Sequence, residues 1–140
     1  MTTGAIPHTL VVYGSSSRAD SVLQELAKAA REGGRRVTVL SLAAEEPDSG
    51  CCDTRSVLWN EICRDLAREH LARASRALKS TESVELEVLT YRGRHPSDAV
   101  AREAVARGAD EIVLADPAAT ALGRRERRRL RRRSQVPVSE

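Results

Sequence analysis

Three cysteines and a histidine are the residues in this sequence with the clearest potential for metal binding. Cys51 and Cys52 are adjacent, Cys63 follows eleven positions later, and His70 lies seven positions beyond Cys63. Paired zinc ligands are usually separated by at least two residues. Seven residues of helix would also place His70 about 10 Å along the axis from Cys63. We therefore expect no metal site, and the odd number of cysteines suits a reducing compartment.

Serine, histidine and aspartate side chains give a second arrangement to consider, a hydrolytic triad of Ser15, His95 and Asp98. Such a triad also needs two donors for the oxyanion and a sharp turn that exposes the nucleophile. The sequence carries no motif for either. We expect His95 to be a loop residue preceding Pro96, and we predict no catalytic residues and no enzymatic activity.

The segment SSRADS, residues 16–21, resembles the Ser-Gly-Gly-x-Asp-Ser phosphate loop of ATP pyrophosphatases. The two glycines that would let the backbone approach a pyrophosphate are replaced here by Ser17 and Arg18. We interpret this segment as a helix start with Ser16 or Ser17 as its N-cap.

Arginine is concentrated in residues 124–133, RRERRRLRRR, which hold eight Arg and one Glu. This tract carries +7, whereas the whole chain carries +3, so the remainder carries −4 (3 − 7 = −4). A tract of this density can neutralise phosphates in a salt-sensitive contact with nucleic acid. The alternative is a solvated helix that pairs with acidic patches on a partner subunit. The low aromatic content, 2%, argues against base stacking on single strands.

Hydrophobic periodicity predicts the strands that would position these residues. Short runs rich in Val and Leu, typical of strands buried on both faces of a parallel sheet, occur at 9–13, 37–42 and 111–115. Residues 84–91 instead alternate, with Glu85 and Glu87 between apolar side chains. We expect this last segment to be an edge strand with one wet face.

Helical periodicity follows each predicted strand. Helices are predicted at 18–32, 54–79, 96–107 and, in the arginine tract, at about 118–134. The second helix has an apolar stripe of Leu58, Ile62, Leu66, Leu71, Ala74 and Leu78. Alternating strands and helices predict one α/β domain over residues 1–140, with a doubly wound, open parallel sheet in three α/β/α layers.

Residues 8–116 resemble the universal stress protein family, with a weaker continuation to residue 138. The run LVVYGSSSRA is similar to the family's first strand and following loop. The run YRGRHPSDAVAREAVARGADEIVLAD is similar to its Gly and Pro, the helix ending in Gly-Ala-Asp and the fourth strand. The resemblance implies strand order 3-2-1-4-5, frequent dimers and, in one branch, an ATP site. Only the segment VPVSE is left for a fifth strand, which we expect to be short or missing.

In this architecture, ligands bind beyond the carboxyl ends of the strands where the strand order reverses. The resulting candidate nucleotide crevice consists of Tyr13, Gly14, Ser15, Leu42, Asp116, Gly123, Arg124 and Arg125. ATP-binding members of the family have an acidic residue after strand 1, Gly-x2-Gly after strand 4 and a later Gly-Ser/Thr. This chain has Tyr13, a glycine-free Ala-Asp-Pro-Ala and Gly123-Arg124 at these places. We therefore expect ATP binding to be lost or weakened.

Two interpretations of residues 116–125 remain open. In one, Gly123 starts the last helix, and Arg124 and Arg125 hold phosphate. In the other, Asp116 caps a helix that starts at Pro117, so that a carboxylate occupies the anion site. We favour the second, because Asp-Pro is a specific helix-start signal.

The sequence thus favours a non-catalytic universal stress protein-like domain without a cofactor, acting through a homodimer or a protein partner. One alternative is a protein that binds ATP or AMP weakly, with Tyr13 beside adenine and Arg124 and Arg125 on phosphate. Another is nucleic-acid association through Arg124 to Arg133. No apolar run approaches the 18 residues of a membrane span, and the first residues do not resemble a signal peptide. We expect a cytoplasmic protein with no membrane contact.

Overall fold

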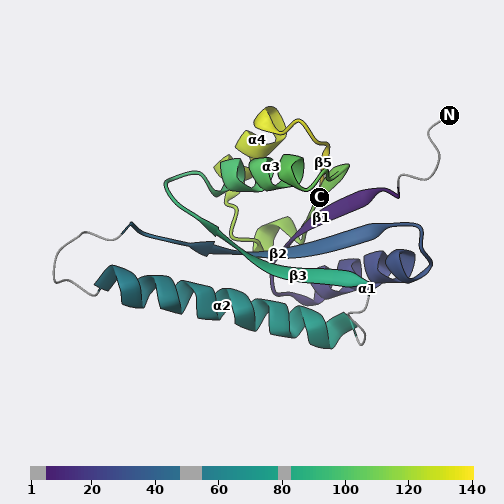
Figure 1. Cartoon of the computed structure of the whole chain (residues 1–140), viewed down its shortest axis with the longest axis horizontal. Coiled ribbons are helices and arrows are strands. Elements are labelled where there is room, and N and C mark those ends of the chain that lie inside the picture. The colour runs from purple at the N-terminus through teal and green to yellow at the C-terminus, as the bar shows by residue number, and fades with distance from the viewer. Residues whose placement is uncertain (1–5, 48–54, 79–82) are drawn as a thin grey trace.

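The chain folds into a parallel sheet covered by helices on both faces, and the computed structural model describes residues 6–47, 55–78 and 83–140 (Figure 1). The elements in chain order are β1 (His8–Tyr13), α1 (Ser17–Arg31), β2 (Arg36–Ala44), α2 (Arg55–Leu78), β3 (Val84–Tyr91), α3 (Pro96–Ala106), β4 (Glu111–Ala115), a 3-10 turn (Pro117–Ala119), α4 (Arg124–Arg133) and β5 (Val138–Ser139).

The strand order is β3-β2-β1-β4-β5. β1 pairs in parallel with both β2 and β4, and Val11 lies between Val39 and Val113 in the register. β3 forms one edge, as its alternating sequence predicts. β5 is short, with Val138 and Ser139 paired to Ile112 and Val113. The predicted fold class and strand order are confirmed.

Alternate residues of the strands face two separate cores, because successive side chains of a strand point to opposite faces. Toward α1 and α2 lie Val11, Tyr13, Val37 and Val39, together with Leu23 and Leu71 from the helices. Toward α3 and α4 lie Leu10, Val12, Leu40, Ile112 and Leu114, together with Val100, Leu122 and Leu130. The Val- and Leu-rich strands are therefore apolar at odd and even positions alike, because both of their faces are buried.

Local capping signals fix several helix ends. Ser16 is the N-cap of α1, and its hydroxyl accepts a hydrogen bond from the Ala19 N–H at 3.0 Å, which confirms the predicted cap. Pro96 occupies the first turn of α3. Gly33 and Gly108, with φ of 76° and 66°, follow α1 and α3. Glycine adopts this left-handed conformation without a Cβ clash.

The last helix begins later than the sequence predicts. Asp116 has φ 57° and its side chain makes no capping hydrogen bond, and Pro117–Ala119 is a single 3-10 turn. Thr120 is extended, and α4 begins at Arg124 with Gly123 as its N-cap. The favoured prediction that Asp116 caps a helix starting at Pro117 is therefore wrong. The interruption brings Leu122 into the core, where it is fully buried.

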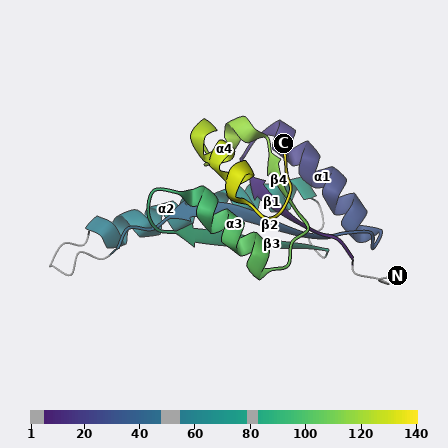
Figure 2. The ribbon, with the colours of Figure 1, turned by 90° about the horizontal axis from the view of Figure 1, so that it is seen from above.

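α4 packs beside α3 despite its charge (Figure 2). Leu122 and Leu130 are 0% and 1% exposed in the core between these helices and the sheet. Two leucines thus anchor the arginine-rich segment.

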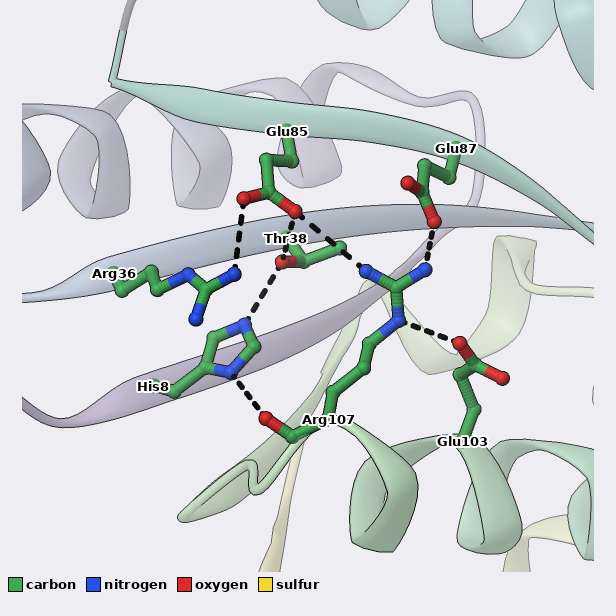
Figure 3. A network of polar contacts seen from close by, with 7 residues as sticks. All are labelled: His8, Arg36, Thr38, Glu85, Glu87, Glu103 and Arg107. Atoms are coloured by element: carbon green, nitrogen blue, oxygen red, sulfur yellow. Dashed lines mark hydrogen bonds and ion pairs between the residues drawn. The ribbon is translucent and has the colours of Figure 1, made fainter.

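A polar network closes the amino end of the sheet (Figure 3). The buried His8 ring lies 2.8 Å from the Thr38 hydroxyl and 3.3 Å from the Arg107 carbonyl oxygen. The Arg107 side chain, which follows α3, pairs with three carboxylates from β3 and α3: Glu85, Glu87 and Glu103. The glutamates of the edge strand thus tie β3 to α3.

Candidate functional site

The carboxyl ends of β1 and β4 lie side by side, as the predicted crevice requires. Tyr13 is the register partner of Ala115, so Gly14 and Asp116 leave the sheet at neighbouring positions. The structure therefore brings the β1 and β4 members of the candidate site together at the point where the strand order reverses.

The 3-10 turn after β4 occupies the space directly above Gly14. A Cβ placed on Gly14 would lie 2.3 Å from both the carbonyl carbon and the oxygen of Ala119, and 2.6 Å from the Thr120 nitrogen. Backbone thus packs on backbone between the ends of β1 and β4.

Hydrogen bonds hold this turn in its position. Thr120 Oγ1 donates to the carbonyl oxygen of Pro117 at 3.0 Å. From α4, Arg127 Nη1 donates to the carbonyl oxygens of Pro117 and Leu122, both at 2.9 Å. Because a guanidinium is a strong donor, these bonds from Arg127 tie the first and last residues of the segment Pro117 to Leu122 to α4.

Tyr13 is turned into the core between the sheet and α1 and α2. It is 3% exposed, and its hydroxyl donates to Asp20 Oδ1 at 2.5 Å. Burial, followed by the hydrogen bond and charge of Asp20, raises the pKa of Tyr13 to about 12. The Arg73 guanidinium in turn donates to Asp20 Oδ2 at 3.1 Å. The Tyr13 hydroxyl thus has its partner inside the protein.

Ser15 and Leu42 take different positions from Tyr13. Leu42 packs against the core on the α3 and α4 side, so it lies on the opposite face of the sheet. The buried Ser15 Oγ makes no hydrogen bond within the described residues. It lies near enough to the Tyr13 hydroxyl to oppose slightly the rise in the pKa of that group.

Gly123, Arg124 and Arg125 are exposed at the start of α4. Arg125 lines an open cavity of about 560 Å³ formed by the exposed side of α4 and the start of α3; its other lining residues are His95, Glu126, Arg128, Arg129, Arg131 and Arg132. Tyr13 and Gly14 do not line this cavity.

His95 and Asp98 bind α4. His95 Nδ1 lies 3.0 Å from Glu126 Oε2, and Ser97 Oγ donates to Glu126 Oε1 at 3.1 Å. Arg129 donates two hydrogen bonds to Asp98, both at 3.1 Å. The polar groups of the hypothetical triad are thus used to join the two helices, and nothing in the described residues joins His95 to Ser15.

These contacts lower the pKa values of both carboxyl groups. For Asp98, the hydrogen bond from Arg129 is the main cause, partly opposed by desolvation. For Glu126, burial alone would raise the pKa, but the hydrogen bonds from His95 and Ser97 outweigh it. Glu126 was not predicted as a functional residue, although it is the single acidic residue of the arginine tract and such an exception indicates a specific partner.

Metal chemistry finds no support in the described part of the chain. There, no three His, Cys, Asp or Glu side chains form a group that would hold an ion. Cys63 is half-buried with a free thiol, and His70 is exposed. Cys51 and Cys52 lie outside the described residues. None of the described helices has the length and hydropathy needed to cross a bilayer.

Solved structures of universal stress proteins share this fold. A protein of that family from Burkholderia pseudomallei is 18% identical, with a TM-score of 0.69, over 97% of this chain and 96% of that chain. The universal stress protein from Archaeoglobus fulgidus, solved with dAMP, is 25% identical, with a TM-score of 0.59, over 96% and 95%. A universal stress protein family protein from Arabidopsis thaliana, with AMP bound, is 16% identical, with a TM-score of 0.56, over 95% and 90%.

No curated protein sequence matches this chain. The family model described as the universal stress protein family does match, over residues 6–138. The sheet order, the helices on both faces and this match lead to one conclusion: the chain belongs to the universal stress protein family.

Proposed function

We propose that this universal stress protein holds no nucleotide in the crevice between β1 and β4, and acts without catalysis through association with protein. One observation carries the proposal, the packing of the Ala119 and Thr120 backbone against Gly14. A nucleotide at this position would have to displace a turn whose Pro117 carbonyl oxygen accepts hydrogen bonds from the side chains of Thr120 and Arg127. A non-catalytic role is supported by His95 and Asp98, whose polar atoms engage α4.

The chemistry at the strand ends is also unfavourable for an adenine nucleotide. The Tyr13 hydroxyl donates its hydrogen to Asp20 and is buried, so it has no donor left for a ribose. Asp116 adds a carboxylate beside the turn. A fixed negative charge repels phosphate, and a buried phosphate needs convergent donors.

Calorimetric titration with Mg·ATP and with AMP, each at low and at moderate salt, tests this proposal. We expect no saturable heat with either ligand. Saturable binding at one site that persists at moderate salt would overturn the proposal. Cooperative thermal unfolding of the same preparation controls for loss of folded protein.

A second candidate is an AMP-type binding protein with a rebuilt phosphate site. It is favoured by the dAMP complex of the 25% identical Archaeoglobus protein and by Arg124 and Arg125 at the exposed start of α4. In that case, binding has to fall in Tyr13→Ala or Arg124→Ala and survive moderate salt in part. Equal affinity in both variants and the wild type would exclude this geometry.

A third candidate is nucleic-acid association through α4. Arg128 and Arg132 are exposed beside Arg125 in the open cavity, which favours contact with an extended polyanion. Binding of a labelled duplex, followed by fluorescence anisotropy, would then fall steeply with salt. Substitution of Arg125, Arg128 and Arg132 by glutamine would have to abolish it.

A further inference from the structure

The cavity between α4 and the start of α3 is lined by positive charge that the protein does not neutralise. Arg125, Arg128 and Arg132 line this open space of about 560 Å³, and all three are exposed. Within residues 6–47, 55–78 and 83–140, the ion pairs of α4 involve Arg127, Arg129 and Arg131, and none involves these three arginines. We call Arg125, Arg128 and Arg132 the arginine row.

The carboxylates beside α4 already have other partners. Asp98 accepts two hydrogen bonds from Arg129, both at 3.1 Å, and Glu140 pairs with Arg131. Glu126 lines the cavity, but both of its carboxylate oxygens accept hydrogen bonds from the first residues of α3 and its N-cap. In the part of the chain that the structure describes, no carboxylate is therefore left to pair with the arginine row.

The arginine row is compact. At 100° and 1.5 Å per residue, its three positions fall within about 60° of one another around α4 and span about 10 Å along the axis. Arg125 and Arg128 are related by i, i+3, and Arg128 and Arg132 by i, i+4, so their like charges oppose the helix. An anion bound to the row would relieve this repulsion and stabilise α4.

Arg129 supplies donors that are already held in place at the wall of the same cavity. Its Nε and Nη2 donate to Asp98, and a guanidinium carries more N–H groups than these two bonds use. Because Asp98 fixes the side chain, Arg129 loses little conformational freedom when an anion binds. The cavity therefore combines one positioned guanidinium with three unpaired ones.

The small extent of this positive surface favours a short acidic segment over a nucleic acid. Asp98 and Glu140 flank the row through their pairs with Arg129 and Arg131, and the chain outside residues 124–133 is net acidic. The phosphates of a duplex continue far beyond about 10 Å, where these carboxylates repel them. A few acidic side chains of a peptide instead end within the row.

We propose that this cavity binds an extended acidic segment of a partner protein, with carboxylates of the segment on Arg125, Arg128 and Arg132. Side chains on one side of an extended chain repeat every ~6.6 Å, and Arg128 and Arg132 are separated by about 6 Å along α4. Acidic residues at alternate positions of the segment therefore match the row. Guanidinium and carboxylate groups pair through two parallel hydrogen bonds, as Arg129 and Asp98 do within the protein.

This inference rests on the proposed function, association with protein, and deepens it by naming the chemistry of the partner. Fluorescence anisotropy tests it with a labelled peptide that has glutamate at alternate positions and serine between them. We expect saturable binding of this peptide, weaker at higher salt, and no binding of the same peptide with glutamine in place of glutamate. Absence of saturable binding by the glutamate peptide at low salt would overturn the proposal.

Substitution of Arg125, Arg128 and Arg132 by glutamine should weaken peptide binding at least ~10-fold, as expected for the loss of three exposed ion pairs. The variant should remain folded, because the substitutions remove like-charge repulsion from α4. Thermal unfolding checks this point. Peptide binding that is unchanged in the folded variant would show that the peptide binds elsewhere and would exclude this site.

The matched control replaces Lys28, Arg31 and Arg76 by glutamine. These three side chains are exposed in the last turns of α1 and α2, which cover the other face of the sheet. The control variant therefore has the same net charge as the first variant but keeps the arginine row. Its affinity for the peptide should stay within ~2-fold of the wild type, since distant exposed charges are screened. Equal losses in both variants would reduce the effect to net charge and contradict a defined site.

A labelled DNA duplex, measured at the same moderate salt, separates the two kinds of polyanion. We expect it to bind more weakly than the glutamate peptide. Tighter binding of the duplex through the arginine row would replace this proposal by nucleic-acid association. Saturable AMP heat from a protein that still binds the peptide would instead overturn only the proposed loss of nucleotide binding.

Discussion

Gly14 at the end of β1 and Ala119 in the turn after β4 are in direct backbone contact, although 105 positions separate them in the sequence. A single added methyl group on Gly14 would lie 2.3 Å from the carbonyl carbon of Ala119, far inside the distance at which carbon atoms attract one another. This contact brings the turn after β4 directly onto the end of β1. It makes the absence of a side chain at Gly14 a requirement of the fold.

The first prediction concerns this contact. Gly14→Ala should lower the free energy of unfolding by about 3 kcal/mol, because the neighbouring atoms are backbone and cannot swing away. Urea denaturation measures the change. Gly34→Ala is the control, since its Cβ would meet only the Ala29 carbonyl oxygen, at 3.7 Å. Equal effects of the two substitutions would show that Ala119 does not press on Gly14 in solution.

The second prediction concerns Arg127. Arg127→Ala removes the donor shared by the carbonyl oxygens of Pro117 and Leu122, and should cost about 1–2 kcal/mol of stability. Arg128→Ala, an exposed neighbour on α4, should change stability by less than about 0.5 kcal/mol. Chemical denaturation of both variants gives the comparison. If Arg128→Ala lowers stability as much as Arg127→Ala does, the loss comes from a weaker α4 helix and not from the hydrogen bonds that Arg127 donates to Pro117 and Leu122.

The third prediction concerns the anchoring of α4. Leu130 is 1% exposed in the core beneath α3 and α4, so Leu130→Ala should cost about 2–4 kcal/mol. Hydrogen exchange should also show faster exchange of the α4 amides. Val105→Ala removes apolar atoms from the exposed side of α3 and should have little effect on either measurement. Unchanged protection of α4 in Leu130→Ala would contradict the packing described above.

The fourth prediction is a loss of α3–α4 stabilisation in acid. The pKa values of Asp98 and Glu126 are lowered in the folded protein, so both groups stabilise the fold at pH values above their unfolded-state pKa. Their contribution is lost as the pH falls through the lower, folded-state values. The stability difference between wild type and Glu126→Gln should therefore be constant near neutral pH and shrink below pH about 4.5. Denaturation curves across the acid range measure it.

The control for that experiment is Glu61→Gln, an exposed carboxyl group on α2. Its stability difference from the wild type should stay near zero throughout the same pH range. If the stability difference between wild type and Glu126→Gln does not shrink in acid, the charge of the Glu126 carboxylate does not stabilise the contact between α3 and α4.

The fifth prediction concerns Tyr13 at alkaline pH. Its pKa is raised from 10.0 to about 12 in the folded protein, so its contribution to stability is present below pH 10 and is lost as the pH rises through 12. Tyr13→Phe should abolish that part of the alkaline decline. Ultraviolet titration of tyrosinate in Tyr91→Phe should show Tyr13 ionising only near pH 12. Ionisation near pH 10 would mean that the hydroxyl is exposed and not bound to Asp20.

The sequence by itself determined the fold. Apolar runs such as 9–13 and 111–115 specify strands buried on both faces, and the alternation around Glu85 and Glu87 specifies an edge. Ser16, Pro96 and Gly108 mark helix ends through contacts within a few residues. Signals of this kind are local, so they can be recognised without knowing what lies across the sheet.

Only the tertiary structure decided the site and the exposed face of α2. Asp116-Pro117 is a sound local signal for a helix start. A short turn forms there instead, with Leu122 buried in the core and the Arg127 side chain donating hydrogen bonds to the carbonyl oxygens of Pro117 and Leu122. Leu58 and Leu71 are thirteen positions apart, which turns them about 140° from each other around the helix axis. Leu71 therefore faces the core and is buried, whereas Leu58 faces outward and is 56% exposed. Periodicity specifies which residues share a face, whereas the position of the sheet decides which face is buried.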